Sequence, residues 1–368
     1  MARSFNIRPL TTDYRDELRL FPDAWHKVGL VLLALVILGF LFFANTRWLG
    51  LATDALVAIV GASALMILTG FCGQVSLGHA AFLGLGAYTA GIFGQHLEAP
   101  FWLALPAAGL VSAAIGLMVG PLALRLHGLY LAIVTLGLTF IVQHVLLSLP
   151  DLTGGAAGLA VPMHTGFGKS ASATDFGDFW NTTTIGSFEL VFEQKLYLVF
   201  LGVAVAIVLM TKNLARSRTG RAMMAVRDHD LAAAVLGVDP TKTKLTAFFV
   251  SSFFAGIAGA MYAMKAQFIT VAPPFDLFMS IEFIAMIVLG GIGTTFGAVW
   301  GAIAFVFLKP VAHAVGAALP FLSTLTSNEQ ERIVFALLIL GFLLFEPLGL
   351  VGLWLRVKRY FLAWPFRY

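Results

Sequence analysis

The stretch from Ala55 to Leu97 contains no Asp, Glu, Lys or Arg, and it constrains the fold more than any other feature of the chain. About 20 apolar residues suffice for one membrane-crossing helix, so a longer uncharged run belongs in the hydrocarbon of a bilayer. Its middle, however, reads GFCGQVSLGHAAFLGLGAY (70–88), with five glycines beside Gln74, Ser76 and His79. We therefore expect a membrane segment that is interrupted by glycines and carries polar side chains.

The composition agrees with a membrane protein. Of the 368 residues, 59% are hydrophobic and 11% are charged, and the mean hydropathy is +0.91. A soluble domain carries about 25% charged residues, so most of this surface is expected to face lipid. The pI of 9.2 reflects basic residues whose positions indicate the orientation in the membrane, and we expect no nucleic-acid partner. Cys72 is the single cysteine, which excludes an intrachain disulfide and a cysteine metal cluster.

Nine apolar runs indicate the fold class. Backbone polar groups must be satisfied inside a bilayer, and the runs do not alternate as barrel strands would, so each run is expected to be helical. The prediction is an all-α integral membrane protein, a polytopic helix bundle of about 8–10 transmembrane helices with glycine-rich broken or re-entrant segments. The runs cover about 28–44, 49–69, 75–95, 101–124, 128–149, 196–210, 246–266, 281–318 and 333–353.

The run 281–318 leaves two alternatives, because it is expected to begin and end outside. It crosses twice, which gives about ten spans, or it dips in and returns as a re-entrant pair beside about eight spans. Two full crossings would place Lys309 near the middle of the membrane. Residues 286–305 also repeat the apolar lead, clustered glycines and small-residue helix of 66–88, which suggests a possible inverted repeat.

The basic residues predict the orientation and the domain limits. Residues 1–27, 211–245 and 354–368 hold five, seven and four of the 23 Lys and Arg residues. The positive-inside rule places all three in the cytoplasm. We expect a cytoplasmic N-terminal tail at 1–27, and not a cleaved signal, followed by a transmembrane domain at 28–353. This domain would contain an outer loop at 150–195 and a cytoplasmic loop at 211–245, and a cytoplasmic C-terminal tail would follow at 354–368.

Polar residues within the broken stretch are the first candidate site. Polar side chains in a membrane span face a bundle interior or a cavity, and an interrupted helix frees backbone groups to line a polar path. We expect Gln74, Ser76, Gly78 and His79 to line a translocation path near the membrane midplane. The alternative is that Gln74 and His79 only form hydrogen bonds to neighbouring helices. For most of the glycines, close helix packing is an equally good explanation.

The segment from Arg216 to Phe249 is the second candidate site. Asp230 has the chemistry of a helix N-cap and Gly237 that of a residue just beyond a helix end, so LAAAVL (231–236) is predicted to be a short helix. The apolar residues around it, including Met223 and Leu236, favour a docking surface. A solvated loop that only sets topology is the alternative.

A third candidate is LTGGAAGL (152–159), at the outer end of a predicted span. Thr153, Gly154, Gly155 and Gly158 are expected to form a tight periplasmic turn, because glycine adopts conformations that other residues avoid. Contact with an external partner is the alternative.

Signals of catalysis and of metal binding are missing from the sequence. There is no nucleotide-binding Gly-x-x-x-x-Gly-Lys-Ser/Thr, no Gly-x-Ser-x-Gly and no His-Glu-x-x-His, and the eight histidines have no ligand-like spacing. We therefore expect no catalytic residue and no metal. The carboxylates Asp54, Glu282 and Glu346 lie near the ends of spans, which weakens the alternative of a self-sufficient secondary carrier or channel.

Four blocks in order resemble the permeases of branched-chain amino-acid ABC importers. GFCGQVSLGHAAFLGLGAY is similar to the family signature, and LTGGAAGL to its Thr-Gly-Gly-x-x-Gly turn. The segment 216–249 resembles the family's cytoplasmic coupling segment, with Asp230 in place of the usual Glu, and VLGGIGTTFGAVWGA (288–302) resembles its late glycine-rich segment. The long N-terminal tail and outer loop fit the longer, LivM-like permease subunit.

The resemblance implies a division of labour, with 28–353 as the transmembrane permease domain, 150–195 as its periplasmic loop and 211–245 as its cytoplasmic coupling loop. A second related permease, two ATP-binding-cassette ATPase subunits and a periplasmic substrate-binding protein are the expected partners, in a bacterial inner membrane. ATP and Mg would be bound by the ATPases, with no cofactor in this chain. The cargo would be branched-chain or related small amino acids, or alternatively urea, amides or other small organic solutes. The motion of the ATPase would be received by Arg227, Asp230, Ala233, Ala234 and Gly237.

Overall fold

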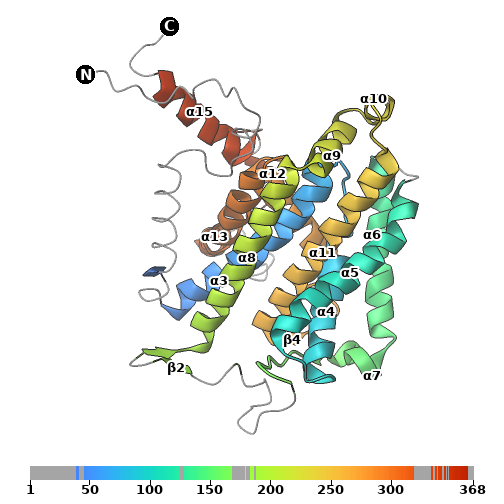
Figure 1. The fold of residues 1–368 in the computed structure, drawn as a ribbon. Helices are drawn as coiled ribbons and strands as arrows, with labels where there is room; N and C mark the ends of the chain where they lie inside the picture. The colour runs from blue at the N-terminus through green and yellow to red at the C-terminus, as the bar shows by residue number, and fades with distance from the viewer. Residues whose placement is uncertain are drawn as a thin grey trace.

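Apolar helices make up most of the structure (Figure 1), which is a computed structural model. The residues that it describes are 39–40, 45–124, 128–167, 179, 183–185, 188–318, 333–334, 336–337, 339–341, 344, 346 and 348–363. The first half of the chain forms α3 Thr46–Leu65, the π-helix η1 Met66–Phe71, α4 His79–Gln95, α5 Phe101–Leu124, α6 Leu129–Leu147, α7 Pro150–Thr153, the 3-10 helix η2 Gly155–Ala157 and β1 Leu159–Ala160. The second half forms β2 Thr183–Ile185, β3 Phe188–Leu190, α8 Phe192–Arg216, α9 Arg218–Asp228, α10 Asp230–Val235, α11 Pro240–Ala266, β4 Phe268–Ile269, α12 Leu277–Gly290, α13 Thr295–Ala318 and α15 Gly349–Ala363.

Six of these helices are long and apolar enough to cross a membrane, and α12 is a shorter apolar helix. The all-α polytopic membrane fold is thereby confirmed. The predicted run 28–44 falls mainly outside the described residues, and the run 333–353 is described only in part. The six candidate spans are Thr46–Phe71, Phe101–Pro121, Tyr130–Leu147, Phe192–Arg216, Pro240–Ala266 and Thr295–Val315.

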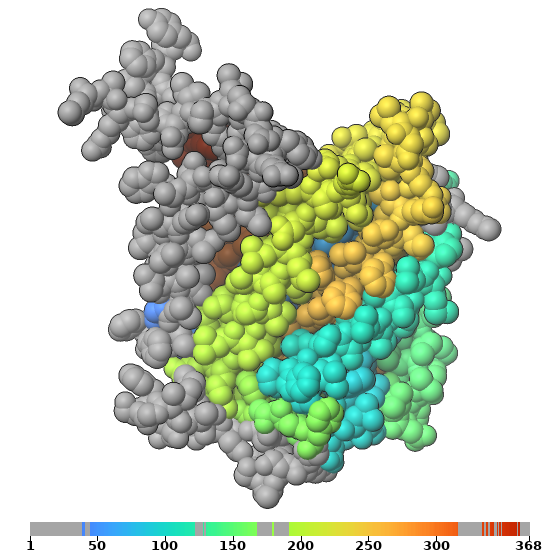
Figure 2. All heavy atoms as spheres, viewed as in Figure 1, coloured from blue at the N-terminus to red at the C-terminus, as the bar shows by residue number. Residues whose placement is uncertain are grey.

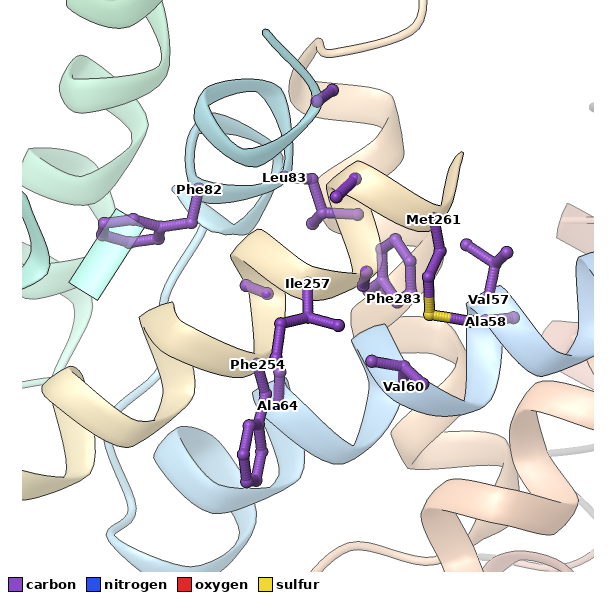
Figure 3. Packing of buried hydrophobic residues seen from close by; sticks show 14 of the residues in the cluster. Val57, Ala58, Val60, Ala64, Phe82, Leu83, Phe254, Ile257, Met261 and Phe283 are labelled. Atoms are coloured by element: carbon purple, nitrogen blue, oxygen red, sulfur yellow. The ribbon is translucent and has the colours of Figure 1, made fainter. Parts of the chain in front are cut away.

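The core is centred on α3 and α11, which are the two most buried of the candidate spans. Helix α11 packs against α4 and α5, and α3 packs against α8 and α13. Figure 3 shows Phe283 of α12 beside Met261 of α11 and close to Val57 and Ala58 of α3. Side chains from three helices thus meet at the middle of the bundle.

Glycines allow two of these helices to approach closely. A Cβ atom at Gly86 of α4 would collide with the carbonyl oxygen of Gly256 on α11, and one at Gly259 would collide with that of Leu83. Backbones in contact at this distance tolerate no side chain between them. The packing explanation of the glycines is therefore confirmed for Gly86.

The predicted helical run 75–95 is helical only from His79 onward, and residues 75–78 belong to a non-helical connection. Helix α3 continues into η1, the chain turns at Gly73 (φ +73°), and α4 begins only at His79. The His79 Nε2 atom lies 3.0 Å from the carbonyl oxygen of Gly61, far back along α3. Residues 72–78 thus run back along α3 in a non-helical conformation. Such a conformation is tolerated in a membrane protein because the backbone polar groups find partners in neighbouring helices.

The run 281–318 forms a hairpin of α12 and α13. Gly61 faces Phe283, and Gly70 faces the backbone of Gly293 in the turn between these helices. Residues 61–70 and 283–293 therefore run in the same direction, so this pair of glycine-rich segments does not support an inverted repeat. The long α13 fits the alternative in which the run crosses rather than dips, although α12 is shorter than a full span.

The two ends of the bundle are different in structure. Helices α9 and α10 lie at one end, and α7, β2 and β4 lie at the other (Figure 1). At this second end β1 pairs antiparallel with β4, and β2 with β3. The predicted cytoplasmic segment 211–245 and the described part of the predicted periplasmic loop 150–195 are thus at opposite ends.

Candidate functional site

Arg227, near the end of α9, connects the short helices to the membrane bundle. Its Nη1 atom donates a hydrogen bond of 2.8 Å to the carbonyl oxygen of Gly70, at the end of η1. Its Nη2 atom lies 2.9 Å from Oδ1 of Asp228, which holds the guanidinium from the other side. A Cβ atom at Gly73 would lie 2.7 Å from Cγ of Arg227, so the stem of the arginine rests on this glycine.

The same arginine also contacts the second glycine-rich turn. A Cβ atom at Gly293, between α12 and α13, would lie 3.0 Å from Nη1 of Arg227. The backbone N–H of Gly293 donates to Sδ of Met66 in η1, at 3.2 Å. One side chain from α9 therefore contacts both glycine-rich turns, the one after η1 and the one between α12 and α13.

Helix α10 is held on the bundle by a charge pair and a buried alanine. The carboxylate of Asp230 lies 3.6 Å from Nζ of Lys244 on α11, and Ala233 is buried. The N-cap is His229 and not Asp230 as predicted, because Nδ1 of His229 accepts a hydrogen bond of 3.3 Å from the N–H of Ala232. The carboxylate of Asp230 pairs with Lys244 instead.

The predicted helix end at Gly237 is confirmed. Gly237 has φ +86°, in the left-handed region that favours glycine, and its N–H donates to the carbonyl oxygen of Ala234 at 3.0 Å. A Cβ atom there would have no neighbour within 4 Å. Gly237 and Ala234 are thus on the open surface, within reach of a partner.

An apolar surface projects from this end of the molecule. The exposed fractions of Leu231, Val235 and Leu236 are 71%, 88% and 83%. Figure 2 shows this part of the chain, in yellow, as a knob that stands out from the bundle. Met223 and Val226 of α9 are buried and attach the knob to the bundle. Exposed apolar groups in this arrangement are typical of an interface.

A cavity of about 300 Å³ lies beneath the knob, lined by Gln74, Arg227, Asp230 and Lys244 among others. Gln74 is buried, and its Oε1 atom has no hydrogen-bond partner among the described residues. Gln74 is therefore placed beside the residues predicted to receive the ATPase, at the end of the bundle where α9 and α10 lie.

The other predicted path residues point into the bundle of their own chain. Ser76, Gly78 and His79 are buried, and Oγ of Ser76 accepts a bond of 3.3 Å from the N–H of Gly78. Gly78 fits tightly against the backbone of Thr135. Val75, which lies between Gln74 and Ser76, is exposed. Their role in the translocation path stays a prediction.

The predicted turn at 152–159 packs within the protein. Oγ1 of Thr153 donates to the carbonyl oxygen of Leu146 at 2.6 Å, and accepts from the N–H of Gly155 at 3.2 Å. Gly154, Gly155 and Gly158 all have positive φ. A Cβ atom at Gly158 would lie 2.6 Å from Cζ of Phe268, on β4. These contacts favour a structural turn that ends α7, leads into β1 and packs against β4.

The structure also assembles charges that the sequence reasoning treated as separate. Asp54 of α3 pairs with Lys265 of α11, and Glu282 of α12 lies 3.2 Å from Lys309 of α13. Their separation in sequence hides these pairs, and only the presence of charge within apolar runs signals them. Within the described part of the chain, no group of three or more His, Cys, Asp or Glu residues is placed to hold a metal ion.

Known proteins are similar in sequence to this chain over most of its length. A family model described as the permease component of branched-chain amino acid transport systems matches residues 47–343. The chain is 33% identical over 332 residues to the high-affinity branched-chain amino acid permease LivM of Salmonella typhimurium, which covers 88% of this chain and 75% of the relative. It is 25% identical to BraD of Pseudomonas aeruginosa (82% and 94% covered) and to LivH of Escherichia coli (85% and 96% covered). No solved structure matches the chain.

The family match, the relatives and the polytopic helical fold agree with each other. The chain therefore belongs to the permease family of branched-chain amino acid transport systems, and it is a multi-pass membrane permease subunit of the ABC-importer type.

Proposed function

We propose that this chain forms one side of a pathway that imports branched-chain or related small amino acids across a bacterial inner membrane. The names of LivM, LivH and BraD support this cargo. A second related permease would complete the pathway, two ATPase subunits would bind ATP and Mg, and a periplasmic binding protein would deliver the amino acid. Both termini would be cytoplasmic. The chain itself would carry out no catalysis.

The single observation that carries the proposal is the knob formed by α10. Its exposed Leu231, Val235 and Leu236 would be covered by an ATPase subunit, since apolar groups of this size are costly to leave in water. The pair of Asp230 with Lys244 and the buried Ala233 hold it against the bundle. A secondary carrier would have no use for such a surface.

The contacts of Arg227 suggest how motion would reach the membrane. A displacement of α10 would move α9, and Arg227 would transmit it to Gly70 and to the turn at Gly293. Both turns connect helices that line the centre of the bundle. Because one side chain contacts both turns, the two turns would then move together.

A substitution at Gly237 tests the docking assignment. Gly237→Asp places a negative charge in the proposed contact, and an uncompensated buried charge is strongly unfavourable. Gly237→Asn is the matched control, because Asn has the same size and also tolerates positive φ. We expect Gly237→Asp to lose co-purifying ATPase and leucine uptake, while Gly237→Asn retains both. Normal co-purification and uptake with Gly237→Asp would show that this surface does not dock the ATPase.

A further inference from the structure

A second, larger cavity lies on the other side of the bundle. It has a volume of about 560 Å³, and α3, α11, α12 and α13 all contribute to its lining. Pockets of roughly 300–1,000 Å³ accommodate small organic ligands. Four of its lining side chains are charged, two positively (Arg47 and Lys309) and two negatively (Asp54 and Glu282).

These charges lie within membrane-crossing elements. Arg47 and Asp54 belong to the span Thr46–Phe71, and Lys309 belongs to the span Thr295–Val315. Charged side chains inside a span are costly and mark substrate or ion pathways, which applies to Asp54 and Lys309 but not to Arg47 at the start of its span. The sequence placed Asp54 and Glu282 near separate span ends, whereas the fold brings them to one cavity.

The charged groups remain accessible from the cavity. Lys309 and Glu282 form an ion pair of 3.2 Å, yet their side chains are 40% and 41% exposed. Asp54 pairs with Lys265 and is 47% exposed. Arg47 belongs to none of the ion pairs found among the described residues. Exposed charges of this kind cannot face acyl chains, so the opening must face water or another protein.

Apart from Tyr262 and His313, the remaining wall of the cavity is apolar. Val57 and Ala58 of α3 and Phe283 and Met286 of α12 line it. Figure 3 shows Val57, Ala58 and Phe283 close together at the middle of the bundle. The cavity thus offers cations, carboxylates and an apolar wall within one volume.

We propose that this cavity binds an α-amino acid with an apolar side chain during transport. The α-ammonium would pair with Glu282 or Asp54, the α-carboxylate with Lys309 or Arg47, and the side chain would contact Phe283 and Met286. The proposal rests on the proposed function for the direction of transport and the role of the ATPases. It also distinguishes between cargo classes, because a zwitterion can form ion pairs with separated charges of both signs, whereas a neutral solute such as urea can only form hydrogen bonds to them.

Protection of an introduced thiol tests this site directly. Met279 lines the cavity, and Met279→Cys in a Cys72→Ser background supplies one thiol there. The assembled transporter, without its binding protein, is treated with 2-sulfonatoethyl methanethiosulfonate in lipid vesicles. Leu97→Cys in the same background is the control, because Leu97 is exposed between α4 and α5 and does not line the cavity.

We expect leucine to slow labelling of Met279→Cys by about tenfold or more at saturation, which a site occupied by ligand requires. Isocaproate lacks the ammonium, isoamylamine lacks the carboxylate, and urea lacks both, so these compounds should protect less than about twofold by the same relation. Labelling of Leu97→Cys should be unchanged. Glu282→Gln or Lys309→Gln, added to Met279→Cys, should abolish the protection by leucine.

Two further measurements keep the outcomes distinct. The double variant Glu282→Lys with Lys309→Glu preserves the ion pair, and co-purified ATPase reports assembly if a single variant misfolds. Equal protection by leucine and urea, or none by leucine, would overturn the binding site.

ATP-driven leucine uptake is measured in parallel with the binding protein present. Uptake without protection rejects the cavity and keeps the proposed function, whereas protection without uptake rejects the proposed function.

Discussion

Arg227 on α9 donates a hydrogen bond of 2.8 Å to the carbonyl oxygen of Gly70, although 157 positions separate them in the sequence. Gly70 belongs to η1, where α3 ends and the chain turns back into the bundle. The carbonyl groups at a helix end lack partners within their own helix, and a charged donor is the strongest partner available. The bond therefore joins α9, in the proposed coupling site, to the break in a membrane helix.

Replacement of Arg227 should uncouple ATP hydrolysis from transport. Arg227→Gln removes a hydrogen bond from a charged donor, which contributes about 1.5–3 kcal/mol. We expect uptake of leucine to fall at least tenfold while the complex still forms and hydrolyses ATP. Arg221→Gln on the same helix is the control, since Arg221 is exposed and bonds only locally to Arg216. Parallel loss of uptake in both variants would contradict a specific role for Arg227.

Substitution within the knob should weaken ATPase binding. Val235 is 88% exposed in the chain, and its burial by a partner would contribute about 1.5–3 kcal/mol. Val235→Asn should therefore reduce the recovery of ATPase with the purified subunit by about tenfold. Lys242→Asn, at the start of α11, should leave recovery unchanged. Full recovery with Val235→Asn would place the ATPase contact elsewhere.

The broken segment should show an alternating pattern of thiol accessibility. Val75 is 42% exposed and Ser76 is 1% exposed, because the extended chain turns successive side chains to opposite sides. In a Cys72→Ser background, Val75→Cys should react with a water-soluble methanethiosulfonate and Ser76→Cys should not. Rapid labelling of Ser76→Cys would instead place it in an open path, as the sequence alone suggested.

Gly86 should tolerate no side chain. Gly86→Ala would push a methyl group into the carbonyl oxygen of Gly256, so α4 and α11 would have to separate. We expect a lower melting temperature and reduced expression. Gly137→Ala on α6 is the matched control, because its Cβ would meet no atom within 4 Å. Alanine is favoured over glycine in a helix by about 1 kcal/mol, so this control should be as stable as the parent or slightly more so.

Composition and charge placement predicted the helical membrane fold and the opposite ends of 150–195 and 211–245. Both depend on local or summed properties, namely hydropathy over about 20 residues and the density of basic residues. The position of the break was also predictable, since Gly70, Gly73 and Gly78 lie close together. Its path was not, because glycine permits a turn without specifying where the chain goes next.

The long-range contacts escaped prediction for the same reason. Asp54 and Lys265, or Glu282 and Lys309, are paired only when α3, α11, α12 and α13 assemble. The cap at His229 was missed because Asp is the commoner N-cap residue, and the pair of Asp230 with Lys244 overrides that preference. Local propensity is a weak guide where tertiary contacts compete with it.

Uptake into reconstituted vesicles tests the central claim most directly. Vesicles that contain this chain with its partner permease and ATPases should accumulate leucine when ATP and the binding protein are supplied, and those with the chain alone should not. Accumulation of leucine by the chain alone, driven by a proton or sodium gradient, would contradict the account.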